Sequence, residues 1–184
     1  ILILIASTMH QSVLILIPFA IIAKGRAWNK KTILFILIAI AAVMFIGKFT
    51  NFLDTALSDT QYKNVVSDWK QFEDDGTNPI RVLVYAVPTI LSYIGRKIIW
   101  IEDNKLVNLC VNMSIISTGL YVVSMFTSGI FIGRLPIYFS LYNYILLPWE
   151  IENLFTERSK KLVYIGLIGF YLLFYYLICI IANR

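Results

Sequence analysis

Long runs of apolar residues dominate the chain, and short polar segments separate them. Each run approaches the roughly 20 residues that an α-helix needs to cross the hydrocarbon core of a bilayer. The runs are continuously apolar and do not alternate, which favours helices because barrel strands show a period of two. The pattern predicts an all-α, polytopic transmembrane bundle, one domain over 1–184, with about six spans: 1–23, 32–49, 81–101, 106–128, 129–149 and 162–182.

Composition supports an integral membrane protein. Hydrophobic residues make up 59% of the chain, charged residues 15%, and the mean hydropathy is +0.75. A soluble domain with a polar surface does not have this composition. The sequence contains no metal-ligand cluster, phosphate-binding glycine loop, nucleophile elbow or nucleic-acid motif, so we expect neither a metal nor a cofactor.

The net charge of +5 predicts membrane orientation and not a nucleic-acid partner. Most basic residues lie in short loops beside apolar runs, as the positive-inside rule requires of cytoplasmic loops. The loop at 24–31 has four basic residues and no acid, so we expect it to be cytoplasmic. By alternation, the segment 50–80, which is rich in acids, becomes an extracytoplasmic loop. The basic residues near 96–105 and 158–161 return to the cytoplasm.

The extracytoplasmic loop contains a helical pattern of its own. Tyr62, Val65, Trp69 and Phe72 recur at helical spacing, which predicts an amphipathic helix lying on the outer face. Such a helix either shields the bundle from water or acts as a lid over a lipid-linked substrate. Because Ile1 lies within an apolar run, we expect the chain to be the C-terminal part of a longer protein.

The segment "GRLPIYFSLYNYILLPWE" places Arg134 near the outer end of the fifth predicted span. An arginine at mid-bilayer costs about 2.5 to 3.5 kcal/mol, so an intramembrane charge usually faces a cavity. One interpretation is that Arg134 extends to the headgroups. The other is an outward polar pocket, since Tyr138 and Tyr142 follow at i+4 and i+8 and Pro136 frees backbone carbonyls. In such a pocket the guanidinium suits a phosphate or diphosphate.

Three further features are candidates for chemistry. Arg81 enters the membrane from the same predicted side, either as an interfacial residue at a helix start or as the second arginine of a diphosphate clamp. His10, the only histidine, is either a base poised near neutral pH or a structural hydrogen-bonding residue. The acids Glu73, Asp74 and Asp75 either supply a base or are simply solvated.

Asn108 and Asn112, with Gly119 further along the fourth span, form a seam of small and polar residues. Seams of this type pack helices against each other in lipid. We therefore interpret these residues as structural.

The order of several segments resembles a known family. The segments are "IASTMHQSVLILIP", "NPIR", "VPTIL", "VNMS" and "GRLPIYFSLYNYILLP", and they cover nearly the whole chain. They resemble the EpsG family of bacterial membrane proteins, a branch of the Wzy-like polysaccharide polymerases. The resemblance is most specific where an arginine precedes "YF" and a later proline, at Arg134, Tyr138, Phe139 and Pro148.

This resemblance implies a function in exopolysaccharide or capsule biosynthesis in the bacterial cytoplasmic (inner) membrane. A member would polymerise glycan repeat units carried on undecaprenyl diphosphate, without a nucleotide sugar, beside other polysaccharide-synthesis membrane proteins. By analogy Arg134 is catalytic and holds the diphosphate together with Arg81, Tyr138 and Tyr142 line the substrate site, and His10 or a loop acid is the base. The alternatives are a flippase for the lipid-linked glycan and a non-catalytic membrane subunit.

Overall fold

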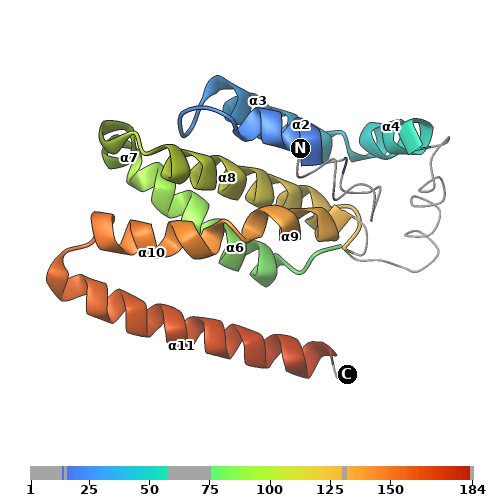
Figure 1. The fold of residues 1–184 in the computed structure, drawn as a ribbon. Coiled ribbons are helices and arrows are strands. Elements are labelled where there is room, and N and C mark those ends of the chain that lie inside the picture. The colour runs from blue at the N-terminus through green and yellow to red at the C-terminus, as the bar shows by residue number, and fades with distance from the viewer. Residues whose placement is uncertain (1–13, 15, 58–75, 130–131, 183–184) are drawn as a thin grey trace.

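The computed structural model describes residues 14, 16–57, 76–129 and 132–182. Every regular element in these ranges is a helix (Figure 1). The elements are α2 (Leu16–Ala23), α3 (Lys30–Met44), α4 (Ile46–Leu57), α6 (Pro79–Ile94), α7 (Arg96–Glu102), α8 (Lys105–Met125), the 3-10 turn η2 (Ile132–Arg134), α9 (Leu135–Ser140), α10 (Asn143–Leu154) and α11 (Glu157–Ala182). The predicted all-α class is confirmed for the described residues.

Helix α8 is the centre of the bundle. It packs against α3 on one side and against α6 and α9 on the other, as Figure 1 shows. Residues along most of its length are buried, including Cys110, Val111, Ile116 and Tyr121. Gly119 faces the ring of Phe35 on α3, so this part of the predicted small-residue seam does pack helix against helix.

Asparagines begin three of the helices. The side chain of Asn29 accepts from the backbone of α3, that of Asn78 from α6 and that of Asn104 from α8. An N-cap oxygen satisfies donors that have no partner inside the helix. These caps fix where the helices start after each polar segment.

Two of the predicted spans bend. The second run turns by 104° at Phe45 between α3 and α4, and the third turns by 67° at Gly95 between α6 and α7. The apolar composition continues through the first bend, so hydropathy does not mark it, whereas Arg96 and Lys97 directly follow Gly95 at the second bend. The predicted loop 50–80 is likewise helical as far as Leu57 and again from Pro79.

The described residues contain two helices, α8 and α11, that are long and apolar enough to cross a membrane, or up to four if each bent pair is one span. The fifth predicted span is divided into η2, α9 and α10, with a turn at Leu141 and Tyr142. Most of the first predicted span, and the helix predicted around Tyr62 to Phe72, lie outside the described residues. The structure therefore does not confirm six spans.

Helix α11 lies beside α10 and is otherwise exposed (Figure 1). At the turn between them, the Lys160 ammonium group lies 3.0 Å from one carboxylate oxygen of Glu152, and the Tyr164 hydroxyl donates to the other at 3.0 Å. The hydrogen bonds from Lys160 and Tyr164 lower the pKa of Glu152. These contacts connect the start of α11 to the end of α10.

Glu150 is a fully buried acid on α10, and neither of its carboxylate oxygens has a hydrogen-bond partner among the described residues. An unsatisfied buried polar group costs about 1 to 3 kcal/mol. We expect Glu150→Leu to raise the free energy of unfolding by about that amount, because leucine fills similar space without the desolvation cost. Thermal unfolding in detergent measures it. A lower melting temperature would show that the carboxyl has a polar partner.

Candidate functional site

A junction of three segments lies at the end of the bundle that the sequence predicts to be extracytoplasmic. The Thr77 amide donates to the Ser124 carbonyl at 3.1 Å, and the Ser124 hydroxyl donates to the Thr77 hydroxyl at 2.7 Å. Both side chains are buried. We call this the Thr77 junction and define it by Gly76, Thr77, Ser124 and Gly133.

Glycines allow the backbones at the Thr77 junction to approach closely. Gly76 has φ +80°, and a Cβ there would lie 2.6 Å from the carbonyl oxygens of Ser124 and Met125. A Cβ on Gly133 would lie 2.7 Å from the Thr77 hydroxyl oxygen. These contacts hold the start of α6, the end of α8 and η2 together.

Gly133→Ala should weaken the Thr77 junction. The new methyl group would collide with the short Thr77 side chain, which Ser124 already holds in place, and overpacking of this kind costs about 1 to 3 kcal/mol. Gly166→Ala is the matched control. No heavy atom lies within 4 Å of its Cβ position, so alanine there should stabilise helix α11 by about 0.5 to 1 kcal/mol. Equal melting temperatures of the two variants would contradict the close packing of Gly133 against Thr77.

Arg81 lies in the first turn of α6, four residues after Thr77, and it is half-buried. Its guanidinium and the Ser140 hydroxyl lie beside the hydroxyl of Tyr121, a fully buried residue of α8. The Arg81 Nε and the Tyr121 hydroxyl are both buried, and neither makes a hydrogen bond of ordinary geometry to a described residue. Two donors are thus close together with capacity to bind an anion.

Aromatic stacking positions Tyr121 on its other side. The rings of Tyr85 and Tyr121 stack with centroids 4.8 Å apart and an interplanar angle of 23°. Tyr85 is one turn after Arg81 on α6. The arginine and both tyrosines therefore form one group, which we call the Arg81 cluster: Arg81, Tyr85, Tyr121 and Ser140.

A row of small polar side chains continues from the Arg81 cluster into the bundle. The Thr89 hydroxyl lies 2.8 Å from those of Ser114 and Thr118. Asn143 donates to the Tyr85 carbonyl at 3.5 Å, while its own Oδ1 is buried without a partner among the described residues. Polar groups inside the membrane are costly unless bonded, so this row indicates a polar lining between α6, α8 and α10.

The predicted residues of the fifth span separate from one another. Arg134 ends η2 and is exposed at the Thr77 junction, and Tyr138 on α9 is 42% exposed. Tyr142 is half-buried and packs against core residues at the turn between α9 and α10. Tyr142 thus lies outside the helix that carries Tyr138.

The two predicted arginines do lie at the same end of the bundle. Gly133, next to Arg134, contacts Thr77, and Arg81 is one turn after Thr77. Sequence reasoning did not identify Tyr121 or Ser140, since only tertiary contacts bring them to Arg81. His10 and the acids Glu73, Asp74 and Asp75 lie outside the described residues, and their roles stay predictions.

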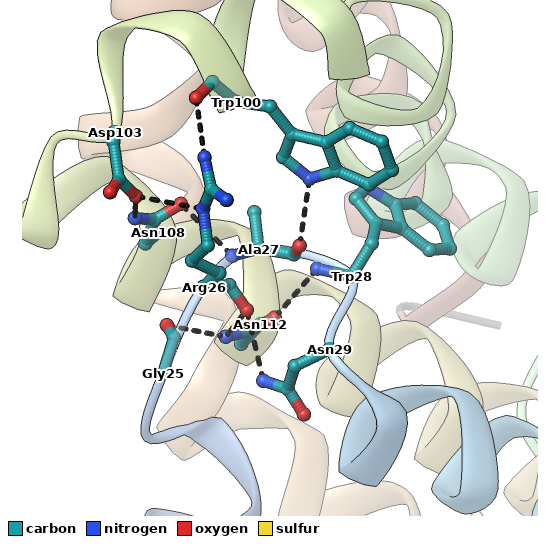
Figure 2. Close-up of polar contacts among 9 residues, drawn as sticks. All are labelled: Gly25, Arg26, Ala27, Trp28, Asn29, Trp100, Asp103, Asn108 and Asn112. Atoms are coloured by element: carbon teal, nitrogen blue, oxygen red, sulfur yellow. Dashed lines mark hydrogen bonds and ion pairs between the residues drawn. The ribbon is translucent and has the colours of Figure 1, made fainter.

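The opposite end of the bundle is closed by two asparagines of α8 (Figure 2). Asn112 donates through Nδ2 to the carbonyls of Ala23, Gly25 and Arg26, and it accepts from the Trp28 amide at 3.2 Å. These contacts bind the loop between α2 and α3. The sequence predicted a structural role for Asn112, and its partners are the last residue of α2 and the loop that follows it.

Asn108 extends the same network. It accepts from the Ala27 amide at 2.9 Å and donates to Asp103 at 2.9 Å. Asp103 in turn forms an ion pair with Arg26, whose Nη2 donates to the Trp100 carbonyl (Figure 2). The side chains of Asn108 and Asn112 are hydrogen-bonded on both their oxygen and their nitrogen, and this geometry fits a structural role.

The described part of the chain contains no group of three or more His, Cys, Asp or Glu residues that could hold a metal ion. The Arg81 cluster offers a guanidinium, two phenols and a hydroxyl, which are electrostatic and hydrogen-bonding groups. The Arg81 guanidinium and the Tyr121 phenol suit an anionic group with several oxygens, while the Ser140 hydroxyl donates to the Ile137 carbonyl at 3.0 Å.

Comparison with protein families gives a match that covers the whole chain. The model of the EpsG family matches residues 1–184. The chain belongs to the EpsG family. Searches of curated proteins and of solved structures give no match. Membership of the EpsG family, together with the apolar helices, identifies an integral membrane protein of polysaccharide biosynthesis.

Proposed function

We propose that this EpsG family member polymerises glycan repeat units carried on undecaprenyl diphosphate. The observation that carries the proposal is that two arginines lie at the same end of the bundle, next to the Thr77 junction. Arg81 is on α6 beside Tyr121, and Arg134 is on η2. Guanidinium groups bind diphosphate oxygens in pairs. Family membership supports the substrate class.

In the proposed reaction, a hydroxyl of one repeat unit attacks the anomeric carbon of the sugar attached to the lipid diphosphate. The new carbon–oxygen bond forms as the bond to the diphosphate breaks, and the electron pair leaves on the diphosphate oxygen. Arg81 and Arg134 stabilise the charge that grows there. His10 or one of the acids at 73–75 takes the proton of the attacking hydroxyl, and Tyr138 and Tyr142 line the path of the glycan.

The proposed setting is the bacterial cytoplasmic membrane, with the arginines on its outer face. The basic loop at 24–31 would then be cytoplasmic by the positive-inside rule. The proposed arrangement uses the six spans that the sequence predicts. Other polysaccharide-synthesis membrane proteins are the proposed partners.

Deletion of the gene in a strain that makes the polymer tests this function. The polymerase predicts single lipid-linked repeat units that accumulate on the outer leaflet, because units still cross the membrane but are not joined. Accumulation on the inner leaflet would identify a flippase. Restoration of polymer by a variant lacking Arg81, Arg134 and His10 together would identify a non-catalytic subunit.

A further inference from the structure

An apolar groove of about 340 Å³ lies between α10 and α11. Leu147, Pro148 and Ile151 line it from α10, and Leu167, Ile168 and Leu172 line it from α11. None of the membrane-spanning part of α11 is buried inside the protein. In a bilayer, the groove therefore opens onto hydrocarbon and suits an apolar chain.

Helix α10 connects this groove with the Arg81 cluster. One turn before the α10 residues that line the groove, Asn143 donates to the carbonyl of Tyr85 on α6 at 3.5 Å. Tyr171 lines the groove from α11. Tyr85 stacks on Tyr121, which lies beside Arg81. Phenol rings combine an apolar body with a polar tip, so they suit the boundary between a charged headgroup and its hydrocarbon chain.

We propose that the α10–α11 groove holds the polyprenyl chain of the lipid carrier whose diphosphate binds at Arg81. This inference rests on the proposed function for the identity of the headgroup. The groove and the Arg81 cluster follow one another: the cation of Arg81 comes first, the tyrosines come next, and the apolar groove comes last. An amphiphile with an anionic head and a long chain fits that sequence of surfaces.

Photocrosslinking to undecaprenyl diphosphate without sugar tests the groove. A photoreactive benzoyl-phenylalanine replaces Ile168 in the full chain, reconstituted in phospholipid nanodiscs that contain this carrier. The control places the same residue at Leu173, which is 56% exposed and does not line the groove. Because five helical residues turn the chain by about 500°, Leu173 points well away from Ile168. We expect capture of the polyprenyl chain to be at least tenfold higher at Ile168.

The outcomes separate this inference from the proposed function. Preferential polyprenyl capture at Ile168 supports the groove even if the protein forms no polymer. Equal capture of phospholipid at both positions, with no polyprenyl preference, overturns the groove even if the same protein does form polymer. Ile168→Trp provides a second measurement, since filling the groove should lower carrier binding tenfold whereas Leu173→Trp should not change it. Equal binding by the two tryptophan variants also overturns the groove.

Discussion

Arg81→Lys is expected to lower polymer formation by roughly 100-fold, the scale of losing one preorganised donor to a developing charge. Lysine keeps the positive charge but loses the planar fork that bonds two oxygens at once. It also loses the Nε that lies buried beside Tyr121. Polymer in a strain that carries only the variant, normalised to its membrane level, measures the effect.

Two variants accompany this measurement. Arg158→Lys is the matched control, since Arg158 is exposed at the start of α11 and far along the chain from the Arg81 cluster. It should leave polymer unchanged. Tyr121→Phe removes the hydroxyl beside Arg81 without changing charge, so it should lower polymer without lowering the membrane level. Normal polymer in Arg81→Lys, at a normal membrane level, would contradict the role of Arg81.

Arg134→Lys distinguishes the two interpretations of the exposed arginine. If Arg134 binds the diphosphate, lysine abolishes polymer while the protein level stays normal, because the bidentate geometry is lost. If Arg134 only extends to the headgroups, lysine serves equally well. We expect the loss. Normal polymer length would show that Arg134 does not bind the diphosphate and that Arg81 is the remaining candidate.

Asn112→Leu should have the largest effect on folding, a loss of about 2 to 4 kcal/mol in the free energy of unfolding. The Asn112 side chain is fully buried and bonds four backbone groups of the loop between α2 and α3. Leucine would leave these groups unsatisfied. It would also release Trp28, which is held at φ 58°, a left-handed conformation that is unfavourable for an aromatic residue.

Asn153→Leu provides the matched control for the loop. Asn153 is exposed on α10, and its side chain donates only to a carbonyl of its own helix among the described residues. The melting temperatures of both variants in detergent measure the difference in stability. A melting temperature of Asn112→Leu equal to that of Asn153→Leu would contradict the structural role of the network.

Hydropathy predicted where the helices lie but not how they bend. The residues from Ile33 to Gly47 include no polar side chain, so hydropathy does not mark the 104° turn at Phe45. Pro136 lies at the start of α9 and Pro148 inside α10, so neither proline marks the turn at Leu141 and Tyr142. Helical spacing from Arg134 also did not reveal that Tyr142 is half-buried whereas Tyr138 is exposed.

The candidate site was predictable in its charges and not in its partners. An arginine in an apolar segment is rare enough to mark a site from composition alone, which brought attention to Arg81 and Arg134. Tyr121 carries no such mark, because a tyrosine within a span is ordinary. Only the packing of α6 against α8 shows that the Tyr121 hydroxyl lies beside Arg81.

Polymerisation by the purified protein tests the central claim most directly. The protein is reconstituted in vesicles with one undecaprenyl-diphosphate-linked repeat unit and no nucleotide sugar, and the product length and the released undecaprenyl diphosphate are measured. We predict products of several units, with one carrier diphosphate released for each bond formed, and roughly 100-fold less of both with Arg81→Lys. Single units that persist with the folded wild-type protein, or equal products from the variant, would contradict the account.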